Sequence, residues 1–315
     1  VMKTRKMILT ATALVTLGEK YLKRALESIE KQTYQNIEHI INDSYSTDNT
    51  LVIIQKYIER NQDKYNIKFI QSEPKGVANA LNVATREATG DLIHYLHSDD
   101  YYLNNESLEK VASRFVENPN LVWLTGNFLV EVSGKKISIP QTYLLRVNPE
   151  IAVSVMNIIS HENTFMKREA VQMYGGFNES QNDVVEYGLW LNLIKDYKPL
   201  IVNDEFTVFI IHKGSKSTGS LIKFFKAVLR AFHTQRKEKV FPLIGYYADK
   251  GFYKQYKQIV KKVVKLETLL DMKEFWVWMI SNKVRVMLLK IFFSHRSLKH
   301  MLKNIIRSNF LFERD

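Results

Sequence analysis

Two adjacent carboxylates, Asp99 and Asp100, have the clearest potential for chemistry in this 315-residue sequence. They lie near the end of the stretch 89–102 (TGDLIHYLHSDDYY), in which the apolar run 92–96 predicts a buried strand of a parallel sheet. Open α/β sheets bind ligands beyond the carboxyl ends of their strands. Carboxylates buried there need a cation, and a divalent metal carrying a diphosphate would provide one. A solvated turn is the alternative, because Ser-Asp-Asp is ordinary turn chemistry.

The segments around this stretch alternate between strand-like and helix-like patterns. The predicted strands are residues 7–17, 37–43, 67–71 and 92–96, and the predicted helices are residues 19–32, 50–60 and 74–88. Short connections favour an α/β fold with a right-handed, doubly wound, mostly parallel sheet flanked by helices. Asp43, the loop 73–76 and the two aspartates then converge on one crevice.

Glycine-rich phosphate-binding motifs are missing from the sequence. There is no GxxxxGK[ST], and no GxGxxG follows the first predicted strand. A nucleotide bound in the crevice is therefore not held by a glycine-rich cradle.

Composition sets further bounds on the class of protein. A chain of this length with 45% hydrophobic residues can bury a large core, in one or two domains. The absence of cysteine excludes disulfides and thiolate metal sites. No apolar run approaches the roughly 20 residues that span a bilayer. Residues 7–17 are too short and too rich in threonine for a signal peptide, so a cytoplasmic location is expected.

Positive charge is concentrated in the last third of the chain. Residues 221–315 contain 21 Lys and Arg against 7 Asp and Glu. Residues 1–220 contain the remaining 24 Lys and Arg and 26 Asp and Glu. We therefore predict a near-neutral domain of residues 1–220 and a basic, α-helical C-terminal region of residues 221–315.

Two amphipathic segments of the basic region, 220–232 and 275–293, combine Lys and Arg with Phe and Trp. This combination is typical of helices that lie on an anionic membrane surface. An ordinary helical subdomain or a homo-oligomer interface is the alternative. Nucleic acid is not an expected partner, because no binding module occurs in the sequence.

Several motifs resemble, in order and spacing, those of family 2 glycosyltransferases with the GT-A fold, of the type that builds bacterial surface polysaccharides. The similar segments are residues 32–38 (QTYQNIE), 42–50 (NDSYSTDNT), 72–76 (SEPKG), 88–100 (ATGDLIHYLHSDD), 161–165 (HENTF), 175–179 (GGFNE) and 186–191 (EYGLWL). Their family counterparts include VDDxSTDxT, HQxxFxRR, GGFDE and DYDLWLRL. The resemblance covers about residues 7–215.

The resemblance implies a UDP-sugar donor bound at the first two strands. Asp43 would hydrogen-bond the uracil or ribose, since a carboxylate accepts from an imide N–H. The end of the first strand, given as Thr10, Ala11 and Thr12, would pack on the base. Stabilisation of a turn or helix start is the alternative role for Asp43.

The resemblance also implies a metal site. Asp99 would hold Mg²⁺ or Mn²⁺ against the donor diphosphate, with Asp100 supporting it or contacting the sugar. His97 stands where the family often has Asp or Asn, and an imidazole there would suit Mn²⁺ better than Mg²⁺. A neutral histidine bonded to backbone is the alternative.

Glu186 occupies the place of the family's catalytic base, which is more often Asp. An inverting transferase needs one carboxylate to deprotonate the acceptor hydroxyl. Asp183 is the rival, because residues three apart share a helix face. An exposed helical carboxylate without a catalytic role is the alternative for Glu186.

The remaining implied contacts surround the donor and the acceptor. His161 resembles an acceptor-side histidine, with a core histidine as the alternative. His212 and Lys213 would close over the diphosphate, unless they belong to a solvated basic loop. The other implied donor contacts are Glu73, Lys75, Asn82 and Ser98.

The expected activity is transfer of a sugar from a UDP-sugar to a hydroxyl of a glycan or lipid-linked glycan, with inversion and with Mn²⁺ or Mg²⁺. A nucleotidyltransferase acting on a sugar phosphate shares a nucleotide-binding α/β domain with acidic metal ligands and is the first alternative. A non-catalytic transferase-like scaffold of a membrane assembly is the second.

Overall fold

The computed structural model describes residues 7–212, except residues 133, 140, 141, 148, 150–152, 154–156, 158 and 181–184. The predicted domain boundary after residue 220 and the basic region beyond it lie outside the described residues. No helix in the part of the chain that the structure describes is long and apolar enough to cross a membrane.

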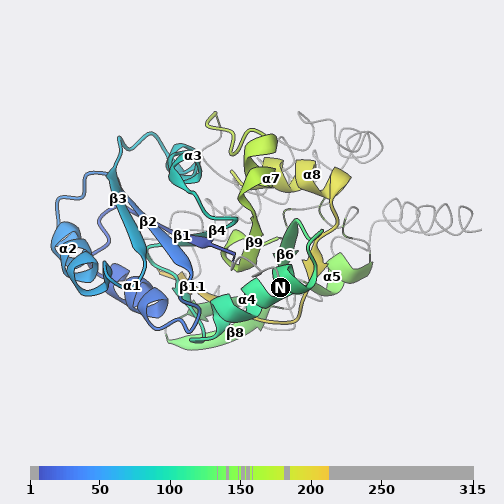
Figure 1. Ribbon diagram of the computed structural model, residues 1–315, viewed down its shortest axis with the longest axis horizontal. Helices are drawn as coiled ribbons and strands as arrows, with labels where there is room; N and C mark the ends of the chain where they lie inside the picture. The colour runs from blue at the N-terminus through green and yellow to red at the C-terminus, as the bar shows by residue number, and fades with distance from the viewer. Residues whose placement is uncertain are drawn as a thin grey trace, which may run out of the picture. The chain divides into compact units, whose positions relative to one another are not determined.

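The described residues form two sheets (Figure 1). The larger has the order β10 (Leu200–Ile201), β6 (Trp123–Thr125), β9 (Thr164–Lys167), β4 (Leu92–His97), β1 (Leu9–Val15), β2 (Ile37–Asp43) and β3 (Asn66–Gln71). The smaller has the order β5 (Tyr101–Tyr102), β11 (Thr207–Ile211), β7 (Phe128–Val132) and β8 (Lys135–Ile139).

The large sheet is mostly parallel, as predicted. Strands β3, β2, β1 and β4 are parallel neighbours, and β10 is parallel to β6. The exception is β9, which runs antiparallel between β4 and β6. Helices cover both faces, so the doubly wound α/β fold is confirmed.

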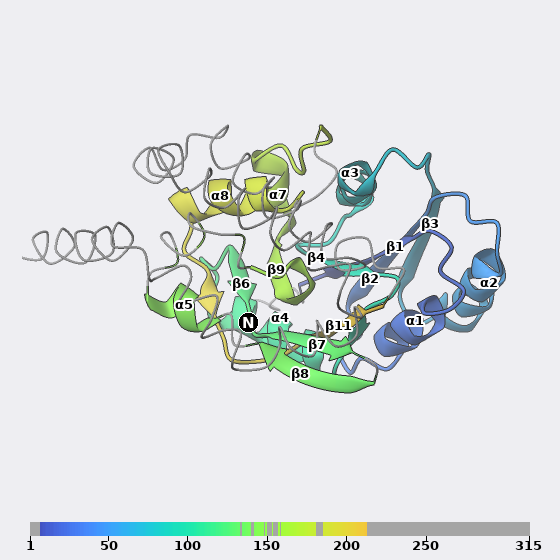
Figure 2. The same ribbon diagram turned by 180° about the vertical axis from the view of Figure 1, so that it is seen from behind.

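Two hydrophobic cores lie on the two faces of the large sheet. One contains side chains of α3 (Val77–Glu87), α7 (Arg168–Met173) and α8 (Tyr187–Asp196). The other contains side chains of α1 (Leu22–Glu30), α2 (Thr50–Asn61) and α4 (Ser107–Glu117). The remaining described helices are short: α5 (Thr142–Val147) and the 3₁₀ turn η1 (His161–Asn163). Both ribbon views draw α1 and α2 away from α7 and α8 (Figures 1 and 2).

The central strands contribute to both cores by alternation. In β4, Leu92 and Leu96 belong to one core, and Ile93 and Tyr95 belong to the other. This explains why β4 reads as a continuous apolar run rather than as an alternating one.

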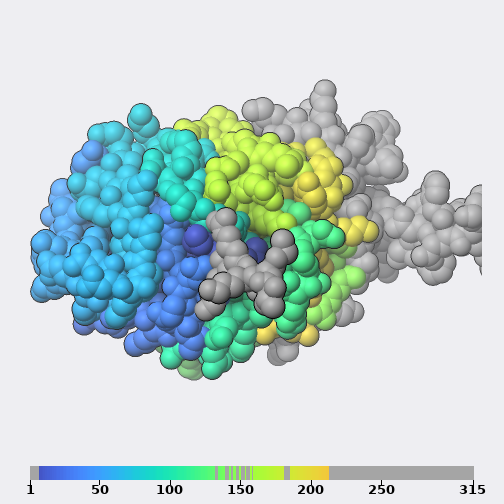
Figure 3. All heavy atoms as spheres, in the orientation of Figure 1, coloured from blue at the N-terminus to red at the C-terminus, as the bar shows by residue number. Residues whose placement is uncertain are grey.

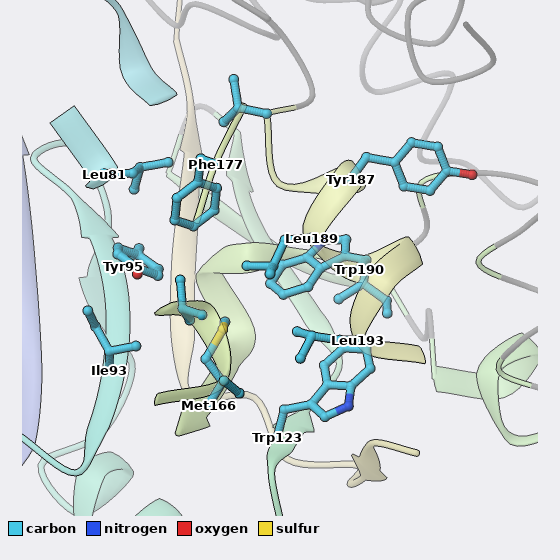
Figure 4. Close-up of a cluster of buried hydrophobic side chains, with 14 of the residues drawn as sticks. Leu81, Ile93, Tyr95, Trp123, Met166, Phe177, Tyr187, Leu189, Trp190 and Leu193 are labelled. Atoms are coloured by element: carbon cyan, nitrogen blue, oxygen red, sulfur yellow. The ribbon is translucent and has the colours of Figure 1, made fainter. Parts of the chain in front are cut away.

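Large aromatic side chains fill the core beside α8 (Figure 4). The rings of Trp123 and Trp190 stack with centroids 5.6 Å apart, and Tyr95 meets Phe177 edge-on at 5.1 Å. In the space-filling view, residues of β1 to α2 lie toward one end of the visible face, and those of α7 and α8 toward the other (Figure 3).

A buried carboxylate joins the amino-terminal halves of the central strands. Glu38 in β2 is 2% exposed and accepts hydrogen bonds from the Thr10 hydroxyl (2.6 Å), the Thr89 amide (2.8 Å) and hydroxyl (2.7 Å), and the Gly90 amide (3.1 Å). Burial alone would raise the pKa of Glu38, but these hydrogen bonds outweigh burial and hold the pKa below its ordinary value.

We expect Glu38→Ala to lower the free energy of unfolding by about 1–3 kcal/mol, because the Thr89 amide loses its acceptor and the Gly90 amide keeps only the Thr10 hydroxyl oxygen at 3.2 Å. Urea unfolding measures the loss, and Glu59→Ala at an exposed position of α2 is the matched control.

The same variant has a pH signature. Because the folded pKa of Glu38 is lowered, its stabilisation is present above the unfolded pKa of about 4.3 and is lost as the pH falls through the folded pKa. The gap in stability between wild type and Glu38→Ala should therefore narrow in acid. A gap independent of pH would show that the charge of Glu38 is unimportant.

Candidate active site

The carboxyl ends of the four parallel strands lie level with one another. Leu14 pairs with His97, and Asp43 pairs with both Val15 and Gln71. The strands therefore end at the same edge of the sheet, as predicted. The candidate site is built on this edge.

The turn between β4 and β5 carries the two aspartates from one sheet to the other. The Ser98 amide donates to the Leu14 carbonyl oxygen (3.2 Å), which ties the turn to β1. Asp99 is partly exposed, whereas Asp100 is completely buried. The two neighbouring carboxylates therefore have different roles.

Asp100 anchors β11. Its Oδ1 accepts a hydrogen bond from the Ile210 amide (3.0 Å), while its Oδ2 is buried and has no hydrogen-bond partner. Burial, together with the charges of Asp99 and Glu162, raises the pKa of the Asp100 carboxyl well above its ordinary value. With no exposed surface, Asp100 fits the supporting role and not that of a direct sugar contact.

Asp99 is paired with His212, just beyond β11. The Nε2 of His212 lies 3.0 Å from Oδ2 of Asp99, and their side chains are 20% and 26% exposed. The ring of Tyr21 packs on the His212 ring with centroids 4.4 Å apart. The sequence predicted His212 at the diphosphate, and the structure brings it to the predicted metal ligand; Lys213 lies outside the described residues.

The pair Asp99 and His212 has the chemistry and spacing of two neighbouring metal ligands. Mn²⁺ accepts both carboxylate and imidazole donors. Adjacent ligand atoms of a six-coordinate ion with bonds of about 2.1 Å lie about 3.0 Å apart. No group of three or more His, Asp or Glu side chains suited to a metal occurs among the described residues. An ion held here would take its other ligands from a diphosphate and water, as Mg²⁺ commonly does.

His97 and His161 contact each other. Their rings meet edge-on with centroids 4.8 Å apart. Nε2 of His161 lies 3.3 Å from Oε1 of Glu162, whose other oxygen accepts from the Ser160 hydroxyl (2.6 Å). The structure thus adds Glu162, which the sequence did not single out, and makes His212 a better placed partner of Asp99 than His97.

Glu186 directly precedes α8 and is partly exposed. Its Oε1 accepts a hydrogen bond from Nδ2 of Asn157 (3.1 Å). One oxygen is therefore held in place, which leaves Oε2 for a substrate proton. The rival base, Asp183, lies outside the described residues.

Asp43 has the alternative, turn-stabilising role. It has no exposed surface, and its carboxylate accepts from the Ser46 amide (3.0 Å), the Ser46 hydroxyl and the Gln71 side-chain amide (3.2 Å). These hydrogen bonds close the turn after β2, and a contact of Asp43 with the donor base stays a prediction.

The assignment of Thr10, Ala11 and Thr12 to the base is wrong. All three are completely buried inside β1, which continues to Val15. The threonines suggested that the strand ends at these residues. Thr10 instead lies inside the strand, where its hydroxyl donates a hydrogen bond to the buried Glu38 carboxylate.

The true ends of β1 and β2 carry two exposed residues that the sequence analysis missed. Leu17 and Tyr45 are 59% and 51% exposed and have φ values of 50° and 53°. Left-handed backbone at a non-glycine residue costs about 1–3 kcal/mol and is concentrated at functional sites. The Leu17 amide donates to the Ser46 hydroxyl oxygen (3.0 Å), which joins the two loops.

Asn82 holds the segment at Phe177 in place. It exchanges hydrogen bonds with the backbone of Phe177 (2.8 Å each) and donates to Glu179 (2.9 Å), to which Asn79 also donates (3.0 Å). Its donor contact stays a prediction. Glu73 and Lys75 are exposed in the loop after β3, where the donor contact stays a prediction.

We expect Asp100→Asn to be tolerated, because the amide oxygen can still accept the hydrogen bond from the Ile210 amide and the raised pKa of the Asp100 carboxyl shows that its site disfavours the charged form. Asp100→Ala removes the anchor of β11 and should cost about 1–3 kcal/mol of unfolding free energy. Urea unfolding compares the two variants, with the same pair of changes at the exposed Asp63 as control. Equal losses of unfolding free energy for Asp100→Asn and Asp100→Ala would contradict the role of residue 100 as a hydrogen-bond acceptor for the Ile210 amide.

Comparison with known proteins identifies the family. Residues 13–175 match the model of glycosyl transferase family 2. An uncharacterized glycosyltransferase of Haemophilus influenzae is 30% identical over 249 residues, which cover 75% of this chain and 93% of the relative. The Escherichia coli UDP-Glc:α-D-GlcNAc-diphosphoundecaprenol β-1,3-glucosyltransferase WfaP is 30% identical over 234 residues, which cover 73% of this chain and 88% of the relative.

Solved structures agree on the fold. Residues 1–349 of Staphylococcus aureus TarS in complex with UDP superpose with a TM-score of 0.57 at 19% identity, covering 74% of this chain and 65% of that one. The mannosyltransferase PcManGT of Pyrobaculum calidifontis, in complex with GDP-Man and Mn²⁺, gives a TM-score of 0.57 at 16% identity. The match covers 92% of this chain and 88% of PcManGT. The chain therefore belongs to glycosyltransferase family 2 and has the GT-A fold.

Proposed function

We propose that this glycosyltransferase moves a sugar from a UDP-sugar to a hydroxyl of a glycan or lipid-linked glycan, with inversion and with a divalent metal. The observation that carries the proposal is the pair Asp99 and His212, 3.0 Å apart at the carboxyl edge of the sheet. A divalent ion held by this carboxylate and a neutral imidazole would offset the negative charge of Asp99 and of a donor diphosphate.

The relatives support a uridine nucleotide. WfaP is named for UDP-Glc, and TarS structures contain UDP or UDP-GlcNAc. PcManGT, with GDP-Man, is less similar in sequence at 16% identity. Membership of the family also favours sugar transfer over nucleotidyl transfer.

Asp99 and His212 would hold Mn²⁺ or Mg²⁺, which supplies positive charge for the leaving diphosphate. Asp100 fixes the backbone of β11 through Ile210, so that His212 stays beside Asp99. The buried anchor thus keeps both ligand atoms in place before the donor binds, which lowers the reorganisation that the reaction requires.

Glu186 is the general base of the proposed reaction. The acceptor oxygen attacks the anomeric carbon, the bond to the diphosphate oxygen breaks, and the acceptor proton passes to Oε2 of Glu186. Asn157 holds Oε1 and so aims the free oxygen. A single displacement of this kind inverts the anomeric configuration.

The proposed acceptor is a lipid-linked glycan presented at the cytoplasmic face of a membrane. WfaP is named for an acceptor with a diphosphoundecaprenol lipid. The basic residues of 221–315 would attract such a surface at about 1 kcal/mol per residue near it. Peripheral attachment and any homo-oligomer are parts of the proposal that rest on the sequence alone.

We expect UDP-glucose or UDP-GlcNAc to raise the melting temperature only when Mn²⁺ or Mg²⁺ is present. Asp99→Ala and His212→Ala should abolish the metal-dependent part and lower UDP release about 100-fold or more, because a charge-stabilising contact is lost. Asp63→Ala is the matched control. Stabilisation by GDP-mannose alone would contradict the uridine assignment, and pyrophosphate release from UTP and a sugar phosphate would indicate a nucleotidyltransferase.

Glu186→Gln should bind donor and metal as the wild type does and lose about 10²–10⁴-fold in turnover, because it keeps the side-chain shape without the base. UDP release with a GlcNAc-diphospho-lipid acceptor measures turnover, and a thermal shift measures donor binding. Glu169→Gln, an exposed glutamate in the first turn of α7, is the matched control. Full turnover of Glu186→Gln would transfer the role to Asp183 or to another group.

A further inference from the structure

We propose that Tyr21 is a positioning residue for the metal and diphosphate site. Its ring holds the imidazole of His212 in the orientation that faces Asp99. This inference rests on the proposed function, in which Asp99 and His212 bind the metal together.

The two contacts of His212 fix its ring from different directions. Nε2 meets the Asp99 carboxylate at 3.0 Å, which sets one edge of the ring. The Tyr21 ring packs against the imidazole at 4.4 Å with an angle of 31° between the planes, which covers one face. An imidazole held along one edge and over one face loses the freedom to rotate away from Asp99.

Tyr21 is itself held firmly. It lies immediately before α1, and the amides of Tyr21 and Leu22 both donate to the Gly18 carbonyl oxygen (3.1 and 2.9 Å). A Cβ on Gly18 would lie 2.8 Å from Val15 and 3.7 Å from Ser98. The close contact is the one with Val15, so glycine lets the loop after β1 pack tightly against the end of that strand.

The other side of the contact is fixed by β11. The Ile210 amide is bound by the buried Asp100 carboxyl, two residues before His212. The imidazole therefore extends from an anchored strand toward an anchored aromatic ring. Tyr21 thus connects the loop after β1 to the ligand pair.

The contact uses the face of the tyrosine ring and not its hydroxyl. Within the described part of the chain, the Tyr21 hydroxyl makes no hydrogen bond. Phenylalanine should therefore replace Tyr21, whereas leucine keeps apolar bulk but loses the flat aromatic face.

The test measures binding of UDP by calorimetry, with and without Mn²⁺, for the full chain. We expect Tyr21→Phe to bind Mn²⁺ and UDP within about twofold of wild type, and Tyr21→Leu to bind about three- to tenfold more weakly. Without metal, Tyr21→Leu should match wild type. Phe69→Leu, at an exposed position of β3, is the matched control.

A double-mutant cycle separates positioning from a general structural effect. If Tyr21 acts through His212, then Tyr21→Leu adds no further loss in the His212→Ala background. Additive losses, or unchanged binding by Tyr21→Leu, would overturn the inference while leaving the proposed function intact. Failure of the wild type to bind UDP or GDP with either metal would overturn both.

Discussion

The passage of the chain from the large sheet to the small one, between His97 and Tyr101, is the constraint on which the candidate site depends. The turn must place one carboxylate in the interior and the next at the surface. The interior carboxyl, Asp100, binds the Ile210 amide and so fixes the strand that carries His212. Burial and the neighbouring charges of Asp99 and Glu162 raise the pKa of this carboxyl, which lowers the cost of placing it beside Asp99. The ligand pair is therefore a consequence of how the two sheets are joined.

The sequence predicts the part of the fold that repeats. Strands β1 to β4 and the helices between them have long apolar patterns and short connections, which leave few topologies. The small sheet has no comparable signal, because a two-residue strand such as β5 has no periodicity and is defined by its partner β11, more than 100 residues later. The antiparallel β9 likewise depends on its neighbours β4 and β6. Pairing over such distances is a tertiary effect that local residue patterns do not contain.

Residue type predicts the site less well than it predicts the sheet, because one side chain has several uses. Asp43 looks like a donor ligand, and its oxygens are taken by Ser46 and Gln71. Asn82 looks the same, and it clamps the loop at Phe177. Asp99 and His212 are 113 positions apart, so only the fold brings them together. The exposed, left-handed Leu17 had no signal at all, since leucine is not a residue that favours such a backbone.

Two departures from the family pattern belong to one local arrangement. His97 replaces a residue that is often acidic, and Glu162 replaces the glutamine of the family's HQ motif. The side chain between them is His161, which meets the ring of His97 at 4.8 Å and lies 3.3 Å from the Glu162 carboxylate. The negative charge missing at residue 97 is thus present across one imidazole, close enough for Glu162 to help raise the pKa of Asp100. An acidic side chain therefore lies in this part of the crevice although residue 97 is a histidine.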